Sequence, residues 1–149
     1  MLIDSTLEMC DAVSIGLSAS TTYLLGNQID TTVVRDVGAG RPIYLVLQVE
    51  TTFTGGNTIQ FKLVSDNSAA IATDTTPSEH WVSDTFAAAA MTAGKTFVVP
   101  LPSGDALPYE RYLGILQVNG ATTAWTAGKI NAFISLDPAG YKSYADAQN

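Results

Sequence analysis

The sequence contains few side chains that could carry out chemistry, and their spacing does not suggest a catalytic site. His80 is the only histidine and Cys10 the only cysteine. Catalysis near neutral pH usually depends on a histidine, a pair of carboxylates or a nucleophile activated by a neighbouring base. Glu79 and Asp84 are near His80 in the chain, so a metal site with one histidine is conceivable, but the ligand spacing of metal sites is missing. We therefore expect His80 to be an ordinary surface residue.

The other reactive groups also favour structural roles. Cys10 could act as a nucleophile with His80, but no cysteine-enzyme motif surrounds it, and a free cysteine usually behaves as a small buried apolar residue. Calcium-binding loops place oxygen ligands at short, regular spacing. The acids that could serve such a loop are far apart: Asp66, Asp74, Asp84 and Asp105. Residues 38–40, Gly-Ala-Gly, precede a strand pattern rather than the helix of a phosphate-binding loop. We expect no enzyme activity, no metal and no cofactor.

Composition limits the partners that the protein can have. The 149 residues carry a net charge of −7, and the seven basic residues are scattered singly. Nucleic-acid binding needs clustered lysine and arginine, so neither nucleic acid nor an anionic membrane is an expected partner. A single cysteine cannot form an internal disulfide, and the first residues lack the basic and apolar regions of a signal peptide. The simplest expectation is a protein made in a reducing cytoplasm.

The elements that would position any site are strands. Residues 43–53 alternate apolar and polar side chains, and residues 58–65 repeat this pattern after Gly55 and Gly56, so we predict that the two segments form a hairpin. A second predicted pair covers residues 112–118 and 130–136, joined by a loop that runs from Asn119 to Gly128. Weaker strand patterns cover residues 12–17, 21–25, 80–86 and 96–101. About eight strands with single apolar faces must stack, which predicts one soluble all-β domain over residues 1–149, a jelly-roll-like β-sandwich with short terminal arms.

Several large apolar side chains are candidates for contact with a partner. Two tryptophans could be exposed in loops, where they would stack on a sugar or anchor a protein contact, although each could equally close one end of the core. Phe133 falls on the polar face of its predicted strand, and both ends of the chain carry apolar or aromatic residues outside the strands. The candidate partner-binding residues are Leu2, Ile3, Leu7, Trp81, Trp125, Phe133, Tyr141 and Tyr144.

Four segments resemble the capsid cement (decoration) proteins of certain short-tailed phages, as typified by a Bordetella phage. These segments are residues 35–49 (RDVGAGRPIYLVLQV), residues 111–113 (RYL), and the pair 126–129 (TAGK) and 134–137 (ISLD). The resemblance follows the order of the chain over most of its length. Residues 65–90 do not match.

The resemblance implies a jelly-roll subunit on the outside of a phage head. It would bridge neighbouring major capsid proteins and stabilise the shell, and it would be made in the bacterial host cytoplasm. We expect it to self-associate, with a dimer as the first choice because two-fold symmetry is the commonest, and a trimer as the second. Fold alone does not decide function, so the alternative is a carbohydrate-binding jelly-roll module that uses Trp81 or Trp125.

Overall fold

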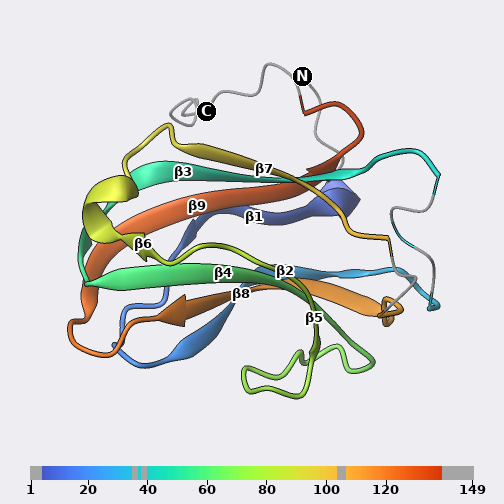
Figure 1. Cartoon of the computed structure of the whole chain (residues 1–149), viewed down its shortest axis with the longest axis horizontal. Helices are drawn as coiled ribbons and strands as arrows, with labels where there is room; N and C mark the ends of the chain where they lie inside the picture. The colour runs from blue at the N-terminus through green and yellow to red at the C-terminus, as the bar shows by residue number, and fades with distance from the viewer. Residues whose placement is uncertain (1–4, 35–36, 38–39, 104–106, 139–149) are drawn as a thin grey trace.

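The computed structural model describes residues 5–34, 37, 40–103 and 107–138, which form two antiparallel β-sheets packed face to face (Figure 1). The first sheet has the order β1-β9-β3-β7 and consists of β1 (Glu8–Ser14), β9 (Trp125–Ser135), β3 (Tyr44–Gly55) and β7 (Thr96–Pro100). The second sheet has the order β2-β8-β4-β5 and consists of β2 (Thr22–Asp30), β8 (Tyr112–Asn119), β4 (Thr58–Asp66) and β5 (Ser78–Val82). The two-residue strand β6 (Phe86–Ala87) also pairs with β4, and the short 3-10 helices are η1 (Ser5–Leu7) and η2 (Ala88–Ala90).

The strand pairs are nested from the ends of the chain inward. β1 pairs with β9, β2 with β8, β3 with β7 and β4 with β5, all antiparallel. Successive members of this series alternate between the two sheets. Nested pairs that alternate between two sheets are the arrangement of a jelly roll. The predicted all-β, jelly-roll-like sandwich is therefore confirmed.

The predicted hairpins are wrong, although their strands are present. β3 pairs with β9 and β7, whereas β4 pairs with β8 and β5, so the chain crosses from one sheet to the other between β3 and β4. Gly55 and Gly56 make this crossing with φ of +76° and +48°. β8 and β9 likewise lie in different sheets. A glycine turn can join two strands of one sheet or two strands in different sheets. The alternation of side chains does not reveal which strand pairs with which.

The core fills the space between the inward faces of the two sheets. The alternate apolar residues of both strands are buried: Leu45, Leu47, Val49 and Phe53 of β3, and Ile59, Phe61 and Leu63 of β4. On the facing strands the core continues through Leu113 and Ile115 of β8 and Ile130 and Ala132 of β9. At one end Phe53 and Trp125 meet edge to face, with ring centroids 5.7 Å apart. A Cβ on Gly56 would lie 2.1 Å from the Trp125 ring, so this crossing requires glycine.

The segment between β4 and β5 is not a free surface loop. It folds back over the outer face of the second sheet, where Ile71 is buried against Val64 and Leu116. The Asp66 carboxylate accepts hydrogen bonds from the backbone N–H groups of Ser68 and Ala72, at 2.9 and 3.3 Å. This outer face is therefore partly covered by the protein's own chain.

Two buried amides hold the connection between β1 and β2. The Gln117 Oε1 accepts the Gly16 N–H at 2.9 Å, and the Gln117 Nε2 donates to the Gly16 carbonyl at 2.8 Å and to the Asn119 Oδ1 at 2.5 Å. Asn119 Nδ2 donates to the carbonyls of Gly16 and Ser18, at 2.8 and 2.9 Å. We call Gln117 and Asn119 the amide clamp. It satisfies backbone groups of a connection that has no strand partner of its own.

Removing half of the amide clamp should destabilise the fold. Gln117→Leu leaves the Gly16 N–H and the Asn119 Oδ1 without their partner, so we expect a loss of about 2–3 kcal/mol in the free energy of unfolding. For a domain of this size the thermal midpoint should fall by about 5–10 °C. Calorimetry on the purified variant measures this, and Gln28→Leu on the half-buried part of β2 is the matched control. A midpoint within 2 °C of the parent would contradict the role of the clamp.

Candidate interaction surface

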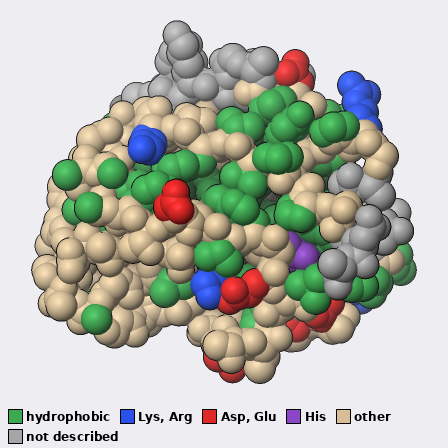
Figure 2. All heavy atoms as spheres, viewed as in Figure 1, with side chains coloured by type: hydrophobic (Ala, Val, Ile, Leu, Met, Phe, Trp, Pro, Cys, Tyr) green, Lys and Arg blue, Asp and Glu red, His purple; other side chains and the backbone are tan. Residues whose placement is uncertain are grey.

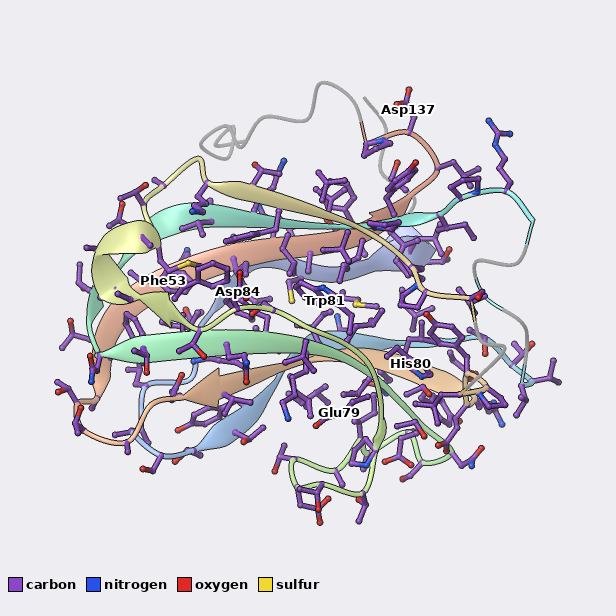
Figure 3. All side chains as sticks on the ribbon, viewed as in Figure 1. Phe53, Glu79, His80, Trp81, Asp84 and Asp137 are labelled. Atoms are coloured by element: carbon purple, nitrogen blue, oxygen red, sulfur yellow. The ribbon has the colours of Figure 1, made fainter. Side chains whose placement is uncertain are left out.

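The described residues contain no arrangement suited to metal binding. No group of three or more His, Cys, Asp or Glu side chains comes together in this part of the chain. Glu79 forms an ion pair with Lys62 instead of facing His80. Figure 3 shows Asp84 well separated from His80 along the seam between the sheets. The one-histidine metal site that the sequence left conceivable is not formed.

Cys10 is an inert thiol in this fold. It lies in β1, buried in the core, and burial raises its pKa to about 12, with a further contribution from the Glu8 charge. A thiol with such a pKa carries almost no thiolate near neutral pH. The expectation that Cys10 behaves as a buried apolar residue agrees with this environment.

His80 is not the ordinary surface residue that the sequence predicted. Its ring stacks on the buried Tyr109 ring with centroids 3.8 Å apart and an interplanar angle of 16°. Its Nε2 lies 2.7 Å from the Ser65 Oγ, which also accepts the Glu110 N–H at 2.9 Å. Glu110 in turn accepts a hydrogen bond from Ser78. We call Ser65, His80, Tyr109 and Glu110 the corner cluster, because it ties the start of β5 to the end of β4 and to the segment before β8.

The corner cluster contains a serine, a histidine and a carboxylate, but its geometry is that of a structural contact. The Ser65 side chain is completely buried and its oxygen already binds a backbone amide. A nucleophile must reach its substrate, and this one cannot while the fold is intact. The missed contact had no local signal in the sequence, because Tyr109 is far from His80 along the chain.

An apolar opening lies at one end of the sandwich. A pocket of about 240 Å³ is lined by Leu7, Ile29, Thr31, Val37, Ile43, Leu113, Ile134, Ser135 and Leu136. We call it the end pocket. At its rim Leu7 is 36% exposed and Leu136 is 55% exposed. An apolar cavity of about 150 Å³ accommodates benzene, so the end pocket has room for roughly one large side chain.

A second apolar surface runs along the seam between β7 and β5. Figure 2 shows hydrophobic side chains gathered across this face of the molecule. Phe86 and Phe97 pack together with ring centroids 4.9 Å apart, and the Lys95 ammonium lies over both rings. Val82 and Val98, at the two edges of the seam, are 41% and 44% exposed. We call this surface the apolar seam.

The candidate partner-binding residues are divided by the structure. Leu7 lines the end pocket, and Trp81 is half-buried between the sheets beside the apolar seam (Figure 3). Trp125 was expected in a loop, but it begins β9 and is 2% exposed, because the Phe53 ring and Gly56 close around it. The remaining terminal candidates lie outside the described residues: Leu2, Ile3, Tyr141 and Tyr144.

Phe133 does not need a partner to cover it. It lies on the outer face of the first sheet, as predicted, but it is only 3% exposed. Its register neighbours are Val46 on β3, which is fully buried, and Glu8 on β1. Phe133 therefore offers no exposed apolar surface to a partner, contrary to its place among the candidate partner-binding residues.

Comparison with known proteins places the chain beside one family. The sequence model of the family described as Bbp16 matches residues 9–134, from β1 into β9. A search of the curated proteins found no match. In the described residues, no helix is long and apolar enough to cross a membrane.

The corner cluster should make stability depend on pH. Burial lowers the pKa of His80 below its ordinary value, and the Glu110 charge opposes this shift only in part. The folded state therefore favours neutral His80, and the unfolded state binds more protons as the pH falls through about 6.5. We expect the thermal midpoint to fall between pH 7.5 and 5.5, a window above the range in which Asp30 and Asp74 titrate.

The control for this effect is His80→Gln, which has no titrating group at this position. The difference in midpoint between parent and variant should shrink as the pH falls from 7.5 to 5.5, measured by calorimetry in buffers of matched ionic strength. A difference that stays constant would show that His80 does not contribute to the pH dependence. Other titrating groups, such as Glu8, affect both proteins alike.

Proposed function

Because this chain belongs to the Bbp16 family, and Bbp16 is the name of a Bordetella phage protein, we propose that it is a cement protein on the outside of a phage capsid. In this role it binds the assembled head, bridges neighbouring major capsid proteins and stabilises the shell. Family membership supports a phage protein associated with the virion. The proposed cement role rests on the surfaces of the molecule.

The observation that carries the proposal is the contrast between reactive and apolar groups. Cys10 and Ser65 are buried, whereas the apolar side chains of the end pocket and the apolar seam reach the surface. Exposed apolar surface of this kind marks sites of protein contact. The structure thus favours a binding protein over an enzyme.

The position of the arms supports attachment at the end pocket. Leu7 and Leu136, at its rim, lie close in the sequence to residues 1–4 and 139–149, which include the aromatic candidates Tyr141 and Tyr144. An eleven-residue arm spans at most about 36 Å when fully extended, enough to reach a neighbouring subunit. A chain end that becomes ordered on binding loses roughly 1–2 kcal/mol of conformational entropy per residue, so weak single sites must act together in many copies on a shell.

No specific observation favours the carbohydrate-binding alternative. Trp125 is buried, so its ring cannot stack on a sugar, and Trp81 is half-buried against the core. The net charge of −7 and the scattered basic residues oppose binding to packaged DNA. A protein surface is the partner that fits the described residues best.

Truncation of the arm tests the proposal. Deletion of residues 141–149 should leave the thermal midpoint within about 3 °C of the parent, because the sequence places them after the Pro-Ala-Gly break at residues 138–140 that follows the last strand, and should weaken co-sedimentation with assembled phage heads at least tenfold. Heads stripped of the protein and free major capsid protein are compared in the same assay, since a site made by two subunits exists only in the shell. Equal binding by the shortened chain would show that the arm is idle, and a much lower midpoint would assign it to the protein's own core.

Loss of the reactive side chains should not affect attachment. Folded His80→Ala and Cys10→Ala variants are expected to bind heads within twofold of the parent, although both lose some stability because each side chain is packed. The measurement is the same co-sedimentation, with melting curves to show that each variant is folded. A folded His80→Ala variant that no longer bound heads would assign a direct role to the corner cluster.

A further inference from the structure

The four edge strands of the sandwich differ in how they are protected. Edge strands present unpaired backbone groups, and proteins usually block them with charges, bulges or cover. β1 carries Glu8 and Asp11 and is interrupted by register shifts around Ala12, which has φ of +49°. β2 bends at Gly26, with φ of +60°, and ends in an ion pair between Asp30 and Arg111.

The remaining two edges are β5 and β7. β5 contains the charged Glu79 and a register shift. β7 contains no charged residue, and its register with β3 is regular from Thr96 to Pro100. Among the described edge strands, β7 is thus the one without charge or bulge, with Pro100 at its end as its one blocking residue, and it lies at the front of the first sheet in Figure 1.

The register of β7 determines which backbone groups are free. Leu101 donates its N–H to Ile43 at 2.8 Å, and Val49 donates to the Lys95 carbonyl at 2.8 Å. Hydrogen-bonded pairs alternate in an antiparallel ladder, so the odd-numbered residues of β7 bond to β3. The backbone groups of Thr96, Val98 and Pro100 therefore point away from β3, toward the open side of the sheet.

We propose that β7 is the self-association edge of the protein, and that it pairs antiparallel with β7 of a second copy about a two-fold axis at Val98. This inference goes beyond the proposed function and gives the self-association expected from the sequence an interface. Val98 would exchange two hydrogen bonds with Val98 of the second copy. Each Thr96 N–H would donate to the Pro100 carbonyl of the other copy, and the lack of a proline N–H costs the two reciprocal bonds.

The side chains favour a second copy as the partner. In this register Phe97 of one copy lies beside Val99 of the other on the inward face, and the two Val98 side chains meet on the outer face, where each is 44% exposed in the single chain. The apolar seam continues across the junction. The strand itself is uncharged, so the net charge of −7 on each copy opposes pairing only at long range, and added salt should strengthen the pairing.

Two substitutions at Val98 test the edge. Val98→Pro removes an N–H that β3 does not use, and a proline is tolerated at an edge position of this kind. Val98→Lys places two like charges opposite each other across the two-fold axis, and their repulsion opposes pairing. We expect the parent to dimerise at micromolar concentration in analytical ultracentrifugation, and both variants to dimerise at least tenfold more weakly with a thermal midpoint within about 3 °C. Val82→Lys, at 41% exposure on β5, is the matched control and should dimerise like the parent.

Amide hydrogen exchange provides a measurement without any substitution. The Thr96 and Val98 amides should exchange fast in dilute protein and more slowly as the concentration rises, whereas the Phe97 amide, which bonds to β3, should be protected throughout. A parent that stays monomeric, or a Val98→Lys variant that dimerises like the parent, would overturn the inference. Protection of Thr96 and Val98 only on phage heads, with no dimer in solution, would also overturn it and would assign the edge to a capsid strand.

The inference and the proposed function can fail separately. If the parent binds heads but the Val98→Lys variant still dimerises, the β7 interface is excluded and the cement role stands. If substitution of Val98 abolishes the dimer but the parent does not bind heads, the β7 interface stands and the cement role is excluded.

Discussion

The antiparallel ladder between the two ends of the domain is the interaction on which the rest of the structure depends. β9 lies between β1 and β3, so the last strand of the jelly roll is hydrogen-bonded on both sides. Without β9 the first sheet would lose its centre, and Leu45 and Leu47 would lose the neighbours that bury them. The nested order follows, because each further pair lies inside the one before. Such pairing joins residues that are distant in the sequence, which predicts slow folding.

The same constraint explains where irregular structure is needed. Each crossing between the sheets must turn sharply at an end of the sandwich, and large side chains close these ends. Gly56 allows the backbone to pass against the Trp125 ring, and Gly128 allows close approach of the Phe53 ring, from which an added Cβ would lie 2.4 Å away. The amide clamp satisfies the backbone between β1 and β2. Glycines and buried amides are therefore as necessary to the roll as its apolar faces.

The sequence predicted where the strands lie better than which strands pair with each other. Alternation along β3 and β4 identified both strands, because each has one buried face, but it could not reveal that they belong to different sheets. The segment from Trp125 to Gly128 resembled a loop because of its small and glycine residues, yet it starts β9, where register shifts accommodate Gly128. His80 was misplaced for a related reason: its contact with Tyr109 joins β5 to the segment before β8, and no short-range pattern encodes such a contact. The family resemblance includes residues 44–49, which begin the central strand β3.

The two sheets differ in the outer surface that they offer, and this difference restricts how a partner could approach. On the second sheet, the segment after β4 lies over the outer face and Ile71 occupies its apolar centre. On the first sheet, the Val46 and Phe133 pair is buried, while the neighbouring Val98 on β7 is exposed. Exposed apolar groups are thus present at the β7 edge and at the rim of the end pocket. The proposed edge contact and a contact at the end pocket would join two neighbours in different directions, as the proposed cement role requires.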